Sequence, residues 1–176
     1  MYQLEEETEA DWWDVEALYD LCFAPGRTAL SSYRLREGVP KVAALCLTLR
    51  DGAGEGGGPG ALAAAIRYWP VRVGGARTLL LGPVAVHPTR QGEGLGGLLI
   101  HESLTEARRL GWGRVLLVGD APYYSRFGFA RMPDVVMPPP TNPDRVLGLE
   151  LEPGAWEGIA GEVTRDLPEP AEPAAS

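Results

Sequence analysis

A strand, a glycine-rich turn and a helix follow one another in Val84-Ala85-Val86-His87-Pro88-Thr89-Arg90-Gln91-Gly92-Glu93-Gly94-Leu95-Gly96-Gly97-Leu98-Leu99. Four glycines stand within six residues, at positions 92, 94, 96 and 97, and leave the backbone at the helix start without covering side chains. The first N–H groups of a helix have no partner within it, and the helix dipole adds partial positive charge there. The stretch therefore predicts a site for a phosphate or pyrophosphate group.

The surroundings of these glycines argue against two common phosphate-binding motifs. A P-loop requires a lysine followed by serine or threonine after its second glycine, and residues 84–99 contain no lysine. A Rossmann fingerprint follows its strand directly and lies near the start of its domain, whereas here His87-Pro88 intervenes. Two alternatives stay open: a nucleotide-binding enzyme of another class, and a helix that uses glycine only for close packing.

The segment Gln91-Gly92-Glu93-Gly94-Leu95-Gly96 has the pattern Gln-x-x-Gly-x-Gly, and Val-Ala-Val-His-Pro precedes it. Together these residues closely resemble the coenzyme A loop of the GNAT superfamily of N-acyltransferases. The resemblance implies that acetyl-CoA is the cosubstrate and that the strand and loop hold it. The residues concerned are Val84, Ala85, Val86, Gln91, Gly92, Glu93, Gly94, Leu95, Gly96 and Gly97. Arg90 and Arg126 are candidates for the ribose phosphate or, equally, ordinary surface charges.

Tyr123-Tyr124-Ser125-Arg126-Phe127-Gly128-Phe129 resembles a second signature of the same superfamily. The resemblance implies that Tyr124 is the general acid that protonates the departing coenzyme A thiolate. It also implies that a backbone N–H, for which we expect that of Val86, stabilises the oxyanion. A phenol of ordinary pKa ~10 is protonated at neutral pH and suits this step. Packing of both tyrosines under neighbouring strands is the alternative.

Two departures from the family pattern concern deprotonation of the acceptor. Many members carry a carboxylate on the strand before the loop, where this chain has Leu79-Leu80-Leu81-Gly82-Pro83. Many also carry an asparagine after the next strand, where Asp120 stands and either takes over its hydrogen bond or loses it. The run Gly119–Phe129, the loop Pro25-Gly26-Arg27 and the segment 153–158 resemble the YhbS-like subgroup of predicted bacterial acetyltransferases.

Hydrophobic periodicity predicts an α/β chain of mixed α+β type, with antiparallel strands first and a right-handed βαβ unit around the glycine-rich turn. We expect strands at residues 2–6, 42–49, 61–71, 77–86, 114–118, 128–132 and 146–151. We expect helices after Thr8, at 32–37, from the turn to Leu110 and at 123–126. The resemblance implies a GNAT-like fold, with a central mixed twisted sheet whose parallel strands splay around the coenzyme A site. Residues 1–165 are expected to form one domain and 166–176 a disordered tail.

Composition limits the partners of the chain. With 16 basic and 24 acidic residues, its formal net charge is −8, which argues against nucleic-acid binding. Neither a membrane-spanning apolar run nor a signal peptide is evident, so we expect a cytoplasmic protein without a membrane partner. Cys22 and Cys46 are expected to be reduced thiols. We expect no metal, and the oligomeric state stays open, a homodimer included.

The resulting interpretation is an N-acetyltransferase that moves an acetyl group from acetyl-CoA to a primary amine by direct attack. A non-catalytic acyl-CoA-binding sensor of the same fold is the alternative. We expect Phe23–Arg27, Tyr33 and the proline-rich segment Met132–Asn142 to line the acceptor pocket, because connections beside a site commonly determine specificity. Arg27 either binds a carboxylate on the acceptor or pairs with the acidic first helix.

Overall fold

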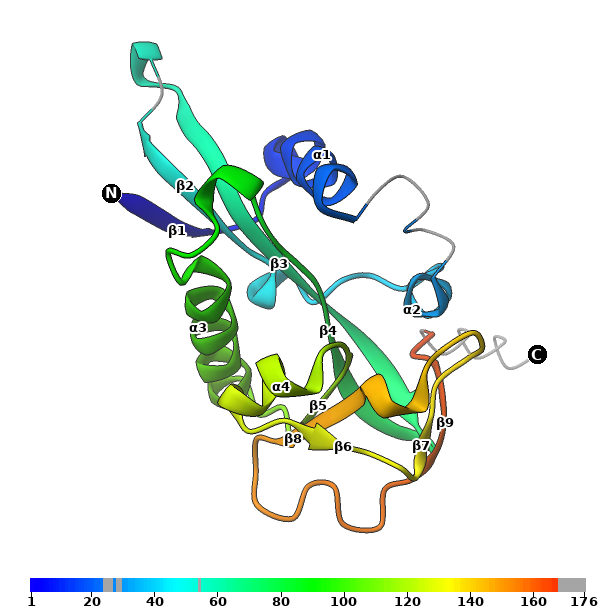
Figure 1. Ribbon diagram of the computed structural model, residues 1–176. Coiled ribbons are helices and arrows are strands. Elements are labelled where there is room, and N and C mark those ends of the chain that lie inside the picture. Colours follow the sequence, from blue (N-terminus) through cyan, green and yellow to red (C-terminus); the bar gives the residue numbers. More distant parts are fainter. Residues whose placement is uncertain (24–26, 28–29, 54, 168–176) are drawn as a thin grey trace, which may run out of the picture.

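A mixed β-sheet forms the centre of the molecule (Figure 1). The computed structural model describes residues 1–23, 27, 30–53 and 55–167. The strands are β1 (Tyr2–Glu6), β2 (Leu47–Ala53), β3 (Pro59–Val73), β4 (Ala76–Val86), β5 (Arg114–Val118), β6 (Ala130–Arg131), β7 (Val135–Val136), β8 (Val146–Glu150) and β9 (Gly161–Arg165). They follow the order β1-β2-β3-β4-β5-β8-β6, and β9 pairs with both β3 and β7. The mixed α/β class predicted for the chain is confirmed.

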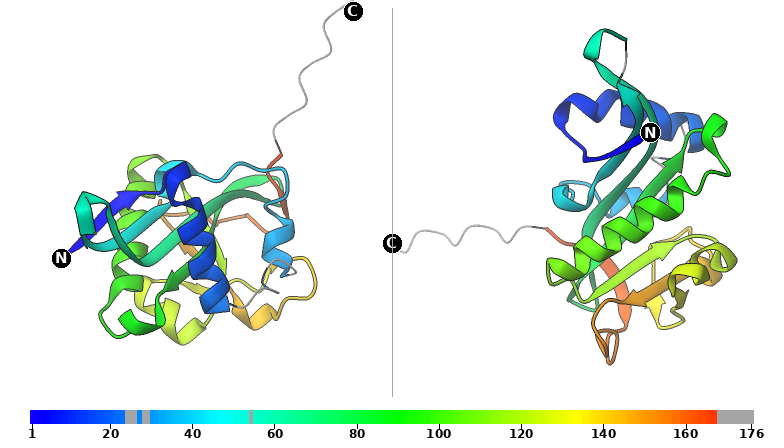
Figure 2. Two further views of the ribbon diagram at one scale, coloured as in Figure 1. Left: turned by 90° about the horizontal axis from the view of Figure 1, so that it is seen from above. Right: turned by 90° about the vertical axis from the view of Figure 1, so that its left-hand side faces the viewer.

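Helices cover both faces of this sheet (Figure 2). They are α1 (Trp12–Phe23), α2 (Ser31–Arg34), α3 (Leu95–Arg109) and α4 (Ala121–Tyr124). Side chains alternate between the faces of a strand, and Ala65 of β3 accordingly packs with α1 while its neighbour Ile66 packs with α3. Within the described ranges, no helix combines the length and the apolarity needed to cross a membrane.

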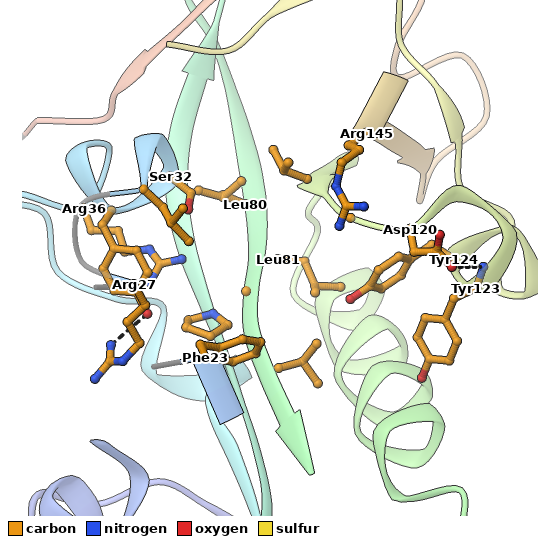
Figure 3. A pocket seen from close by; sticks show the side chains of 17 residues that line it. Phe23, Arg27, Ser32, Arg36, Leu80, Leu81, Asp120, Tyr123, Tyr124 and Arg145 are labelled. Atoms are coloured by element: carbon orange, nitrogen blue, oxygen red, sulfur yellow. Dashed lines mark hydrogen bonds between the residues drawn. The ribbon is translucent and has the colours of Figure 1, made fainter. Parts of the chain in front are cut away.

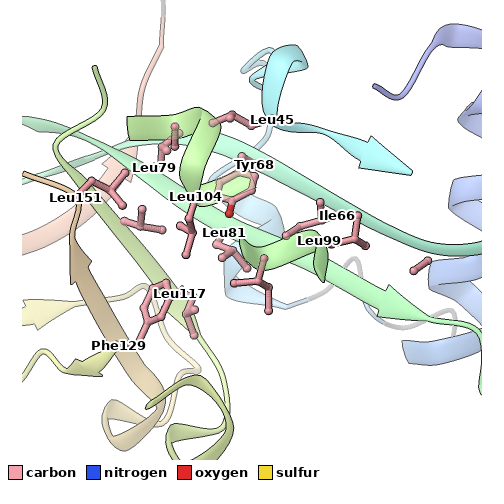
Figure 4. Close-up of a cluster of buried hydrophobic side chains, with 14 of the residues drawn as sticks. Leu45, Ile66, Tyr68, Leu79, Leu81, Leu99, Leu104, Leu117, Phe129 and Leu151 are labelled. Atoms are coloured by element: carbon pink, nitrogen blue, oxygen red, sulfur yellow. The ribbon is translucent and has the colours of Figure 1, made fainter. Parts of the chain in front are cut away.

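The main hydrophobic core lies between α3 and the sheet (Figure 4). Leu99 and Ile100 of α3 are fully buried there against Ile66 and Tyr68 of β3. The hydroxyl of Tyr68, the polar group at the centre of this cluster, forms a 2.7 Å hydrogen bond with Ser103 Oγ. This packing anchors the helix whose N-terminus carries the glycine-rich turn.

The parallel strands β4 and β5 run together for a short distance only. Their register pairs Leu79 with Val115 and Leu80 with Leu116. Beyond Leu81 the pairing of β4 with β3 shifts, so that Gly82 and Pro83 face the single residue Arg67. This bulge bends β4 where its pairing with β5 has ended, and the sheet opens beside it. The bulge therefore lies at Gly82-Pro83.

Several predicted element boundaries are corrected by the structure. The expected helix at 32–37 ends at Arg34, and a 3-10 turn at Ala43–Leu45 delays the strand expected from Val42 until Leu47. The strand expected at 61–71 extends over 59–73, and β7 and β9 were not predicted. A capping box starts the first helical segment, since Thr8 N donates to Asp11 Oδ2 at 2.8 Å. The predicted tail lies outside the described residues from position 168 onward, whereas Asp166 pairs with Arg72 and Arg77.

Candidate active site

Two pockets meet along the opened edge of β4. The first, which we call the loop pocket, encloses about 700 Å³ beside the glycine-rich turn, β4 and Arg126. The second, which we call the tyrosine pocket, encloses about 550 Å³ between the β4 bulge, the end of β5 and Tyr124 (Figure 3). Phe23, Val84 and Tyr123 line both pockets, so the two form one continuous groove.

The glycines of the turn have two structural roles: some leave the backbone open, and one allows close packing. Gly92 and Gly94 have left-handed backbone angles, with φ of 87° and 78°, and a Cβ on either would point into open space. On Gly96 a Cβ would stand 3.2 Å from the Tyr123 hydroxyl. The first helical bond of α3 runs from Leu98 N to Gly94 O, so the N–H groups just before Leu98 remain for an outside acceptor. The turn thus combines an open helix N-terminus, as an anion site requires, with close packing of Gly96 on Tyr123.

Backbone groups of β4 also face the groove. His87 N donates to Ala63 O of β3 at 2.7 Å. N–H directions alternate along an antiparallel strand, so the N–H groups of Val84 and Val86 face away from β3 and that of Ala85 faces β3. Among the described residues these two N–H groups have no backbone partner, so the end of β4 beyond the bulge offers donors to an extended ligand lying where pairing with β5 has ended.

The side chains predicted to surround the coenzyme divide into paired and unpaired groups. Glu93 accepts a 2.9 Å hydrogen bond from the Tyr2 hydroxyl, and Arg90 pairs with Asp51, which favours the surface-charge alternative for Arg90. Gln91 lines the loop pocket, whereas Leu95 also buries its side chain in the core. Arg126 stands 5.5 Å from the Tyr123 ring centre and has no ion pair within the described part of the chain.

Tyr124 points its hydroxyl into the tyrosine pocket (Figure 3), whereas the Tyr123 hydroxyl lies against the start of α3. Gly119 makes this possible, because a Cβ there would stand 2.5 Å from Cε2 of the Tyr124 ring. Burial, with a smaller contribution from Tyr123, raises the pKa of Tyr124 to about 12. The phenol is therefore protonated at neutral pH.

Asp120 acts first on the local backbone. Its Oδ2 accepts a 3.3 Å hydrogen bond from Tyr123 N and caps α4, the short helix that carries both tyrosines. Asp120 also lines the tyrosine pocket. Where the family pattern has asparagine, this chain thus has a carboxylate that positions Tyr124.

Arg27 and Tyr33 line the tyrosine pocket, as predicted for the acceptor side, but Arg27 is held by the chain itself. Its Nε pairs with Asp20 Oδ1 at 3.1 Å, its Nη1 donates to the Tyr33 hydroxyl at 2.8 Å, and its Nη2 pairs with Glu16. Each guanidinium nitrogen therefore has a partner on α1 or Tyr33. Of the two alternatives for Arg27, the geometry favours the ion pair with the first helix.

This geometry predicts a stability effect for Arg27. Arg27→Met leaves Glu16 and Asp20 with fewer partners, and we expect unfolding to become easier by about 2 kcal/mol, less than for a fully buried pair. Thermal unfolding and acceptor KM are measured together. A higher KM with unchanged stability would contradict the ion-pair interpretation and restore the acceptor-binding one.

Two lining residues were not predicted from the sequence. Arg36 follows α2, and Arg145 ends a 3-10 turn just before β8. Arg145 reaches the pocket because Val146 pairs with Val118 at the end of β5, a contact that no local pattern reveals. The proline-rich segment 132–142, expected to line the acceptor pocket, contributes no residue among those described there.

Comparison with known proteins places this fold and groove among acyltransferase enzymes. The model of the acetyltransferase (GNAT) family matches residues 12–129, and the chain belongs to that family. It is 44% identical over 50 residues to the uncharacterised N-acetyltransferase YjhQ of Escherichia coli K12, a match over 28% of each chain. It is 36% identical over 66 residues to YhbS of the same strain, covering 36% of this chain and 40% of YhbS. The matched segments span less than half the length of these curated relatives.

Solved structures resemble the chain over nearly its whole length. YhbS from Escherichia coli in complex with CoA superposes with a TM-score of 0.76 at 26% identity, covering 93% of this chain and 89% of that one. A GNAT family acetyltransferase from Brucella melitensis in complex with acetyl-CoA has a TM-score of 0.63 at 28% identity, covering 93% and 95%. The resemblance to a YhbS-like GNAT acetyltransferase, stated from the motifs, is confirmed.

Proposed function

We propose that this protein transfers the acetyl group of acetyl-CoA to a primary amine by direct attack. The observation that carries the proposal is the continuous groove. It joins an open helix N-terminus, unpaired β4 donors and the hydroxyl of Tyr124. A pyrophosphate suits the N–H groups of the turn, and an extended pantetheine arm suits the free edge of β4.

In the proposed reaction the amine nitrogen attacks the thioester carbonyl carbon. Negative charge then develops on the carbonyl oxygen, and a β4 backbone N–H, for which we assign Val86, stabilises it. As the C–S bond breaks, the Tyr124 hydroxyl gives its proton to the sulfur. The attacking nitrogen, now positively charged, loses a proton and restores the phenol. Because the raised pKa makes the phenolate strongly basic, this return is favourable.

The alternative function is a sensor that binds acyl-CoA without turning it over. Tyr124 argues against it, because Gly119 is kept free of a side chain that would displace this ring from the pocket. Consumption of acetyl-CoA in the presence of an amine panel separates the two functions. No turnover despite tight binding of acetyl-CoA would favour the sensor.

The binding half of the proposal is tested with Gly94→Asp. A carboxylate at this position meets the place where the pyrophosphate approaches the turn, and we expect the Kd for acetyl-CoA to rise at least tenfold, or about 1.4 kcal/mol. Calorimetry measures the affinity. Unchanged affinity would contradict the assignment of the turn to the pyrophosphate.

A matched control for this variant is Gly75→Asp in the β3–β4 turn. Gly75 has a φ of 88°, and a Cβ added there would meet open space, so the added backbone strain resembles that at Gly94. Gly75 lies outside both pockets. We expect Gly75→Asp to retain the affinity for acetyl-CoA, which separates loss of the site from general strain.

A further inference from the structure

Positive charge is in excess on the walls of the tyrosine pocket. Its charged lining residues are Arg27, Arg36, Asp120 and Arg145. Arg27 is paired with Glu16 and Asp20, and Asp120 is engaged in capping α4. Arg36 and Arg145 remain without a carboxylate partner within the described part of the chain.

Arg36 is the more unusual of the two. Its guanidinium carbon lies 3.9 Å from the Tyr33 ring centre, and its Nε is buried without a hydrogen-bond partner among the described residues. Its Nη2 stands 4.0 Å from the position that a Cβ on Gly82 would take, so the group reaches the bulge where β4 opens. Burial lowers the pKa of Arg36, and the neighbouring Tyr33 offsets this only in part. An arginine nevertheless keeps its charge in proteins.

The neighbouring ion pairs cannot supply an anion for Arg36. The adjoining network joins Glu7, Glu16 and Asp20 with Arg27, Lys41 and Arg67. Its three carboxylates and three cations balance, so no negative charge is left over. Arg36 is partly buried and has no carboxylate partner among the described residues, so an anionic ligand that neutralises it gains free energy on binding.

Arg145 adds to the positive potential from the opposite wall. Figure 3 shows its guanidinium directed into the pocket, on the same side as the Tyr124 hydroxyl and across the pocket from Arg36. The positive charge of Arg145 also acts on Tyr124: it lowers the pKa of the phenol, although burial raises that pKa by more. An anionic ligand in the pocket would therefore lie beside the group assigned as general acid.

From this geometry we infer that the acceptor is a small primary amine that carries a carboxylate, and that Arg36 binds this carboxylate. A planar guanidinium matches a carboxylate through two parallel hydrogen bonds. One carboxylate neutralises the charge of Arg36 one for one. The pocket of about 550 Å³ must also admit the acyl end of acetyl-CoA, which favours an acceptor of amino-acid size. This inference rests on the proposed acetyl transfer.

The test uses amines that differ only in the acid group. Glycine, β-alanine, γ-aminobutyrate and δ-aminovalerate are compared with methylamine, ethylamine, propylamine and butylamine as acceptors for acetyl-CoA, and phosphoethanolamine serves as the phosphate counterpart. We expect at least one amino acid to exceed its neutral partner at least tenfold in kcat/KM. The chain length that does so reports the distance from the acetyl group to Arg36.

The variant Arg36→Met assigns the effect to a residue. Because Arg36 has no ion pair to lose among the described residues, we expect thermal stability to be kept or raised, the carboxylate preference to disappear, and turnover of the neutral amine to persist. The matched control is Arg34→Met, two residues earlier and exposed, where Nη1 donates to Pro139 O at 3.3 Å. We expect Arg34→Met to retain the preference.

Each remaining outcome overturns the inference. The inference is contradicted if kcat/KM is equal within every pair or if no turnover across the series depends on the carboxylate. It is also contradicted by a preference for phosphoethanolamine, or by a carboxylate preference that survives Arg36→Met. These results leave the proposed function standing, provided that calorimetry still shows binding of acetyl-CoA and that some amine is acetylated. Failure to bind acetyl-CoA would instead contradict the proposed function.

Discussion

Tyr124→Phe is expected to lower kcat about 100-fold, the scale of a positioned general acid, while the Kd for acetyl-CoA barely changes. The substitution removes only the hydroxyl, and the ring keeps its packing on Phe129 and Tyr123. The loss therefore reports proton donation to the departing sulfur. Steady-state kinetics with a saturating amine give kcat, and calorimetry gives the affinity. Wild-type turnover in the variant would assign Tyr124 to packing and leave protonation to solvent.

Tyr123→Phe provides the comparison for this prediction. Its hydroxyl lies against the start of α3 rather than in the tyrosine pocket, so we expect kcat to change less than tenfold. If the large loss followed Tyr123→Phe instead, the two tyrosines would exchange their assigned roles.

The pH profile supplies a second readout for Tyr124. The phenol of an ordinary tyrosine is half deprotonated near pH ~10, whereas the pKa of Tyr124 is raised to about 12. A raised pKa keeps the acid form present to higher pH. We therefore expect no decline in kcat between pH 8 and 10 that could be assigned to this group.

The parts of the site that could be predicted from the sequence are those built by adjacent residues. The turn at Gly92 and Gly94 needs left-handed backbone angles and opens a helix, so composition and order alone indicate it. The same holds for Tyr124, which follows β5 by a few residues and is positioned by Asp120 and Gly119 next to it. Local geometry determines these features, and a local pattern therefore reveals them.

The acceptor side of the groove depends instead on segments far apart in the chain. Arg145 lines the tyrosine pocket because β8 pairs with β5, and Arg36 reaches the β4 bulge from the segment after α2. Neither arginine stands in a motif, and each resembles an ordinary surface charge in the sequence. The short strands β7 and β9 were missed for the same reason, since they exist through pairing with each other and with β3.

The ion-pair network under α1 is the clearest product of such long-range contacts. Arg67 of β3 donates through Nε and Nη2 to Glu7, with distances of 3.0 and 2.6 Å, and through Nη1 to Glu16 at 2.7 Å. The Glu7 side chain is only 1% exposed. Burial alone would raise the pKa of Glu16, but hydrogen bonds from Arg67 and Arg27 outweigh it and lower that pKa overall. Because the pKa of Glu16 is lower in the folded protein than in the unfolded chain, ionised Glu16 stabilises the folded state at pH values above the ordinary glutamate pKa. This stabilisation is lost as the pH falls through the lowered pKa of the folded protein.

Arg67→Met is expected to lower the free energy of unfolding by about 3 kcal/mol or more at neutral pH, because it leaves the buried Glu7 carboxylate with Lys41 alone. For a chain of this length, that corresponds to a fall in Tm of roughly 6–12 °C. The matched control is Arg72→Met on the same strand, whose 41% exposed side chain pairs with Asp166 and whose loss should cost less than about 1 kcal/mol. The difference between Arg67→Met and the wild type should narrow as the pH falls below the ordinary glutamate pKa of ~4.3 and through the lowered pKa of Glu16, since protonated Glu16 no longer pairs with the arginine. Equal losses for both variants, or a difference independent of pH, would show that the network contributes no more than an exposed ion pair.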